Sequence, residues 1–104
     1  MGISKKARIG NNVTIKDGVI IEDDVVIGDD SYIDYNAIIR NGVEIGKHAF
    51  VGANCVIGEF LADFCKDFKP KTHFLRIGDN ATIRSGSIIY GDTVIGDDFG
   101  TGHR

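Results

Sequence analysis

The chain has 104 residues, of which 42% are hydrophobic and 26% are charged, and its formal net charge is −3. This length predicts a single domain, and this composition excludes a disordered linker. The sequence contains no basic run and no apolar stretch of roughly 20 residues, so we expect neither a nucleic-acid partner nor a membrane partner. It has no charged-then-apolar leader, and two cysteines are too few for a disulfide framework. We therefore expect a reduced, cytoplasmic protein.

Aliphatic residues recur every six positions along almost the whole chain. We call these positions the rungs: Ile3, Ile9, Ile15, Ile21, Ile27, Ile33, Ile39, Ile45, Val51, Ile57, Ile77, Ile83, Ile89 and Ile95, with Thr101 in the last place. Side chains alternate along a strand, so each rung shares one interior with the small or branched residue two places before it. The residue between these two points outward.

A residue that readily takes a positive φ follows most rungs by three positions and would turn the chain there. These corner residues are Asn12, Gly18, Asp24, Asp30, Asn36, Gly42, Asn54, Asn80, Gly86, Asp92 and Asp98. A second, longer period is marked by the glycine that follows every third rung: Gly10, Gly28, Gly46, Gly78 and Gly96. Three hexads therefore form one coil, and the cross-section is a triangle.

The step from Gly46 to Gly78 is longer than the other steps between these glycines, which each equal three hexads. The excess matches a 14-residue insertion at 61–74, which would leave the prism without disturbing its register. The sequence predicts one all-β domain over residues 1–104, a parallel β-helix of about five coils with one protruding arm.

The pattern aliphatic-Gly-x-[Asn/Asp]-small-x, three per coil, resembles the hexapeptide-repeat acyltransferases, whose fold is a left-handed parallel β-helix. The stretch Ile83–Tyr90 and the ending Thr101-Gly102-His103-Arg104 are most similar to those of sugar O- and N-acetyltransferases. The resemblance implies a homotrimer that moves an acetyl group from acetyl-CoA to a sugar or nucleotide-linked sugar, with active sites between neighbouring prisms. Family members usually have more coils and often a cap, so we expect this chain to lack C-terminal coils or a cap.

Histidines are the candidate catalytic bases, because acetyl transfer needs a base of near-neutral pKa to take the proton of the acceptor. Backbone N–H groups would hold the developing oxyanion. His103 is the first candidate, since its glycine neighbours would let a cosubstrate approach the backbone closely. His73 is the second, and it stays open whether either is the base. His48 stands at a corner, either as a ligand or base or as a residue that tolerates a left-handed φ.

The insertion is the candidate wall of the acceptor site. Five apolar residues at its start have the spacing of one face of a short helix that Pro70 would end: Phe60, Leu61, Phe64, Cys65 and Phe68. The arm either folds back on its own prism or reaches over a neighbour, where Phe68, Lys69 and Lys71 would contact substrate. Lys66, Lys69 and Lys71 could also meet phosphates, or simply be solvated.

The outward residues of the third strand in each coil form the candidate oligomer interface: Ile20, Ile38, Val56 and Ile88. An exposed apolar strip on an acidic surface marks an interface, although β-branched residues also favour strands in a monomer. Tyr32 and Phe50 form a second outward pair on another face.

Two rival functions remain. One is a non-catalytic, truncated β-helix scaffold. The other is a metalloenzyme like the γ-class carbonic anhydrases, which share this prism and hold Zn²⁺ with three histidines from two subunits, two of them in a His-x4-His pair. The histidines of this chain, His48, His73 and His103, are widely separated and form no such pair, so the sequence predicts no metal site.

Overall fold

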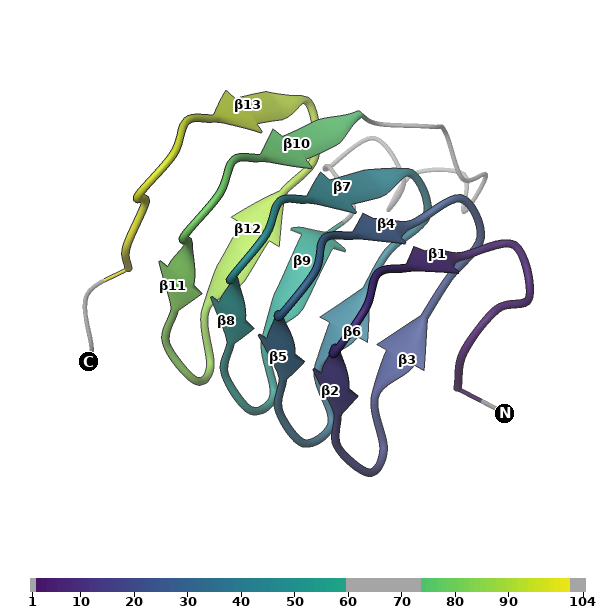
Figure 1. Ribbon diagram of the computed structural model, residues 1–104. Helices are drawn as coiled ribbons and strands as arrows, with labels where there is room; N and C mark the ends of the chain where they lie inside the picture. The colour runs from purple at the N-terminus through teal and green to yellow at the C-terminus, as the bar shows by residue number, and fades with distance from the viewer. Residues whose placement is uncertain (1, 60–73, 102–104) are drawn as a thin grey trace.

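The computed structural model describes residues 2–59 and 74–101, and this part of the chain consists of short strands joined by turns (Figure 1). It includes no helix that could cross a membrane. The strands are β1 (Arg8–Ile9), β2 (Thr14–Ile15), β3 (Ile20–Ile21), β4 (Val26–Ile27), β5 (Tyr32–Ile33), β6 (Ile38–Ile39), β7 (Val43–Ile45), β8 (Phe50–Val51), β9 (Val56–Glu59), β10 (Leu75–Ile77), β11 (Thr82–Ile83), β12 (Ile88–Tyr90) and β13 (Thr93–Ile95).

Three parallel sheets form the sides of a triangular prism. Their strand orders are β1-β4-β7-β10-β13, β11-β8-β5-β2 and β12-β9-β6-β3, so every third strand returns to the same side. Figure 1 shows the coils stacked from the N-terminal to the C-terminal end of the prism. The chain is therefore a left-handed parallel β-helix, and the predicted fold class is confirmed.

The sheet that contains β7 and β10 keeps its register across the insertion. Val43 pairs with Leu75, and Ile45 pairs with Ile77. One coil below, Ile45 pairs in the same way with Ile27, which is three hexads earlier in the sequence. The coils on either side of the insertion thus stack in the register that the glycine period predicts once residues 61–74 are set aside.

The core is a column of aliphatic side chains inside the prism. Ile27, Ile33, Ile39 and Ile57 are at most 1% exposed, and the residues two before these rungs are buried with them. Each such isoleucine contributes about 1.5–3 kcal/mol by transfer from water. Coils that each bury little alone are stabilised in this way by stacking on their neighbours.

The corners have the backbone that the sequence predicts. All eleven Asn, Asp and Gly corner residues have positive φ, from 59° at Asn12 to 79° at Gly42 and Gly86. His48 joins them with a φ of 56°. A repeated left-handed residue therefore turns the chain from one side of the prism to the next.

Glu59, which precedes the insertion by two residues, and Phe74, its last residue, contact the same corner of the coil above. Glu59 ends β9, where a β-bulge shifts the register so that Tyr90 pairs with Glu59. The carbonyl of Glu59 accepts from the Gly91 N–H at 3.4 Å, and that of Phe74 accepts from the Thr93 N–H at 3.2 Å. The predicted arm lies outside the described residues except for Phe74, whose ring centroid lies 4.8 Å from the guanidinium carbon of Arg76.

Candidate functional site

Most of the sequence-predicted site residues lie outside the described part of the chain. His73 and His103 are among them, as are the arm residues Phe68, Lys69 and Lys71. Their roles therefore stay predictions. His48 is the one imidazole within residues 2–59 and 74–101, so the geometry of a histidine site can be described there.

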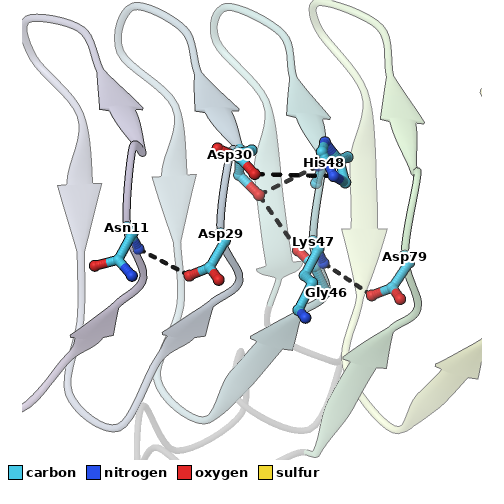
Figure 2. Close-up of polar contacts among 9 residues, drawn as sticks. Asn11, Asp29, Asp30, Gly46, Lys47, His48 and Asp79 are labelled. Atoms are coloured by element: carbon cyan, nitrogen blue, oxygen red, sulfur yellow. Dashed lines mark hydrogen bonds and ion pairs between the residues drawn. The ribbon is translucent and has the colours of Figure 1, made fainter.

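His48 lies at the corner between β7 and β8, stacked on Asp30 of the coil below (Figure 2). Its Nε2 is 3.9 Å from the Asp30 Oδ2, and the side chains are 61% and 45% exposed. Its backbone N–H donates to the Asp29 carbonyl at 2.9 Å. A contact between side chains this exposed contributes only about 0–1 kcal/mol. The positive φ and the regular backbone bond agree with the interpretation of His48 as a residue that tolerates the corner.

Beside His48 runs a column of polar residues that link successive coils. The Asp29 Oδ1 accepts from the Asn11 N–H, and the Asp79 Oδ1 accepts from the Lys47 N–H, each at 2.8 Å (Figure 2). These carboxylates bind backbone rather than a common centre. Within the described residues, no group of three or more His, Cys, Asp or Glu side chains is arranged to hold a metal ion.

The predicted interface residues form one continuous outward column. Ile20 pairs with Ile38, Ile38 with Val56, and Val56 with Ile88, all in the β12-β9-β6-β3 sheet. Ile20 is 43% and Ile88 is 53% exposed, while Ile38 and Val56 are half-buried. The alignment that the sequence predicts is therefore present on one side of the prism.

A second outward column carries aromatic side chains on the β11-β8-β5-β2 sheet. The rings of Tyr32 and Phe50 stack with centroids 5.7 Å apart and planes at 25°. The Lys16 ammonium lies 5.8 Å from the centroids of both Tyr32 and Tyr35. The ring of Tyr32 therefore stacks on the ring of Phe50 and also contacts the Lys16 ammonium.

Three hydroxyl- or thiol-bearing residues gather around Arg84 near the C-terminal end of the described prism, and sequence reasoning missed them as a group. The Thr101 Oγ1 accepts from the Arg84 N–H at 2.8 Å and lies 3.2 Å from the Ser87 Oγ. The Cys55 thiol donates to the Arg84 carbonyl at 3.1 Å, and burial raises the pKa of this thiol. The signal in the sequence was Thr at a rung, three hexads after Ile83.

A family model described as bacterial transferase hexapeptide (six repeats) matches residues 6–37 and 24–59, which together exceed half of the chain. No significant match was found among curated protein sequences.

Two solved structures share the fold. One is a UDP-N-acetylglucosamine acyltransferase from Campylobacter jejuni, 26% identical with a TM-score of 0.80, which matches 98% of this chain and 44% of that chain. The other is serine acetyltransferase isoform 3 from Entamoeba histolytica, 21% identical with a TM-score of 0.73, which matches 98% of this chain and 34% of that chain. The chain thus spans less than half the length of these two proteins. The repeat, the prism and the family match together place this chain in the bacterial transferase hexapeptide family.

Proposed function

We propose that the protein is an acyltransferase that moves an acetyl group from acetyl-CoA to a hydroxyl or amine of a sugar or nucleotide-linked sugar. The observation that carries this proposal is the likeness of 98% of the chain to a UDP-N-acetylglucosamine acyltransferase at a TM-score of 0.80. Membership of the transferase hexapeptide family supports the same reaction class. The family match supports acyl transfer as a reaction class, and the acetyl donor and the sugar acceptor are proposed in addition to it.

The proposed reaction needs one base and one oxyanion site. The acceptor O–H or N–H gives its proton to an imidazole while its oxygen or nitrogen attacks the thioester carbonyl carbon. Backbone N–H groups hold the oxyanion of the tetrahedral intermediate. The C–S bond then breaks, and the sulfur of CoA leaves with the proton that the imidazole returns. We assign the base to His103, with His73 as the second candidate.

The proposal includes self-association as a homotrimer through the column of Ile20, Ile38, Val56 and Ile88. Apolar residues on the outer side of a sheet are stabilised when a second copy covers them. Two of the four are at least 43% exposed in the single chain, which supports this assignment. The arm would wall the acceptor site beside a neighbouring prism, with Phe68, Lys69 and Lys71 toward the substrate.

Replacement of each histidine in turn tests the assignment of the base. The assay follows release of the CoA thiol from acetyl-CoA in the presence of UDP-N-acetylglucosamine and other nucleotide-linked sugars. We expect His103→Ala to lower kcat about 100-fold or more, within the range that general bases contribute. His48→Asn is the matched control, because Asn is the usual corner residue, and it should keep wild-type activity. Wild-type activity in His103→Ala, with loss in His73→Ala, would transfer the role to His73.

A further inference from the structure

The three sides of the prism differ in the residues that point outward from them. On the β12-β9-β6-β3 side, the isoleucine column consists of Ile20, Ile38, Val56 and Ile88. On the β11-β8-β5-β2 side, the aromatic column consists of Thr14, Tyr32, Phe50 and Thr82 (Figure 1). Neither column contains a charged residue.

The third side has a different character. Three of the five residues in its outward column are charged, and the column consists of Arg8, Val26, Glu44, Arg76 and Val94. The Arg76 Nε lies 3.3 Å from the Glu44 Oε1, so charges on this side already pair within the chain. Because charged residues are depleted at the core of protein interfaces, the two uncharged columns are better suited than this side to contact another protein.

A homotrimer needs two different contact surfaces on every copy. Copies related by a threefold axis meet head to tail, so a patch on one copy contacts a different patch on the next copy. A twofold dimer, by contrast, can pair one patch with itself. The isoleucine column supplies only one of the two surfaces that the proposed homotrimer requires.

The aromatic column has the properties of the second surface. Tyr32 and Phe50 are half-buried and their rings stack with centroids 5.7 Å apart, so these side chains are held in place within the single chain. Aromatic side chains are enriched at protein interfaces, where they supply a large contact area at little cost in conformational entropy. The aromatic side and the isoleucine side share the corner at Asn36, which joins β5 to β6. A rotation about an axis beside this corner brings one side of a copy to face the other side of the next copy.

The charges next to the two columns favour the same arrangement. In the first coil, Lys16 follows β2 and Glu22 follows β3. In the second coil the signs are reversed, since Asp34 follows β5 and Arg40 follows β6. Rotation about an axis parallel to the prism keeps each coil level with the same coil of the neighbour. Each of these two layers then has a cation on one side of the contact and an anion on the other, and such complementarity helps to set the register of an interface.

We propose that the aromatic column is the surface against which a second copy of the chain packs its isoleucine column, repeated around a closed ring. This inference rests on the homotrimer of the proposed function and names the other half of its interface. The side that contains Glu44 and Arg76 then faces outward around the ring.

Three charge-introducing variants test the two surfaces separately. Phe50→Lys places a charge in the aromatic column and Val56→Lys places one in the isoleucine column, where an unpaired charge is costly to desolvate. Val26→Lys on the third side is the matched control. At a concentration where light scattering shows the wild type to be a trimer, we expect Phe50→Lys and Val56→Lys to be monomers and Val26→Lys to remain a trimer. Circular dichroism checks that each variant is folded.

Mixing the two monomeric variants gives the sharpest test. Phe50→Lys keeps an intact isoleucine column and Val56→Lys keeps an intact aromatic column, so the mixture can form one contact but cannot close the ring. We expect a dimer with one copy of each variant, which native mass spectrometry identifies because the two chains differ in mass. Neither variant should form this dimer alone at the same total concentration.

Two outcomes overturn the inference alone. In one, Phe50→Lys assembles like the wild type while Val56→Lys dissociates, which would mean that the isoleucine column does not pack on the aromatic column. In the other, a mixture of the two folded variants contains no mixed dimer. A monomeric wild-type chain overturns both this inference and the proposed homotrimer, whereas the acetyl-transfer assay tests the proposed reaction independently of either.

Discussion

Gly28 lies directly beneath Gly46 of the next coil, and the contact leaves no room for a side chain. A Cβ on Gly28 would lie 2.6 Å from the carbonyl carbon of Gly46 and 2.7 Å from the Lys47 nitrogen. Both contacts are with backbone, which cannot rotate away as a flexible side chain could. The recurring glycine is therefore required, wherever another coil stacks above it, by the closeness of the two coils rather than by a left-handed φ.

The first prediction concerns this contact. Gly28→Ala should lower the free energy of unfolding by about 1–3 kcal/mol, because overpacking forces two coils apart. Gly96→Ala is the control, since a Cβ there would meet nothing within 4 Å among the described residues, and it should change stability by less than about 0.5 kcal/mol. Urea unfolding followed by circular dichroism measures both. Equal stability of the two variants would contradict this account of the repeat.

The second prediction concerns the left-handed corner at His48. His48→Asn should keep stability within about 0.5 kcal/mol, because Asn has the same tolerance for a φ of 56°. His48→Val should lose about 1–2 kcal/mol, since a β-branched side chain is strained in this region. Thermal unfolding of the two variants compares them directly. If His48→Val were as stable as His48→Asn, the positive φ at this corner would not restrict which residue can stand there.

The fold was predictable because its signals lie close together in the sequence. The corner at Asp24, for example, needs only its own small polar side chain and the rungs on either side. The bulge opposite Glu59 was not predictable, because it depends on Gly58 taking a φ of 86° and on Tyr90 in another coil. Residue types alone do not say which of several glycines will adopt a left-handed backbone.

The candidate site was less predictable than the fold for a related reason. The outward column through Ile38 follows from the three-hexad period. The contacts of Thr101 with Arg84 and Ser87 depend on the orientations of two hydroxyls in neighbouring coils, which the period does not specify. The pair of Arg40 with Glu59, with 3.5 Å between Nη2 and Oε1, is one position out of step with the repeat because the bulge adds a residue. The six-residue repeat alone therefore does not predict pairs of side chains that lie on either side of a β-bulge.

The third prediction concerns the buried thiol of Cys55, which is 0% exposed. Burial raises its pKa, so the thiol stays protonated in the folded protein at pH values where an unfolded chain ionises it. Its contribution to stability is therefore complete below the ordinary pKa of about 8.5 and is lost as the pH rises toward the folded-state value.

Alkylation of a Cys65→Ser variant with iodoacetamide at about pH 8 checks that the Cys55 thiol is buried and protonated in the folded protein. We expect the alkylation of Cys55 to be at least about 100-fold slower in the native protein than in guanidinium, because the reaction requires opening of the core. A Cys55 that reacts equally fast under both conditions would contradict its placement inside the prism.

The fourth prediction concerns the outward column of the β12-β9-β6-β3 sheet. Val56→Lys places a charge in the middle of this column and should convert the proposed trimer to monomers, because an unpaired charge at an interface is costly to desolvate. Val26→Lys is the matched control, since Val26 is also a half-buried outward valine, and it lies on β4 between Arg8 and Glu44 of the neighbouring strands. Light scattering after size exclusion gives the mass of each. Dissociation by Val26→Lys, with Val56→Lys still associated, would assign the interface to the β1-β4-β7-β10-β13 sheet.

The measurement that tests the central claim most directly is a calorimetric titration of acetyl-CoA into the purified chain, with its mass in solution determined alongside. An acyl-CoA-dependent transferase should bind acetyl-CoA saturably at one site per chain, with Kd on the order of 1–100 μM, in the range of typical substrate constants. The absence of binding heat across several temperatures, in a protein that circular dichroism shows to be folded, would contradict the transferase proposal and favour a non-catalytic scaffold.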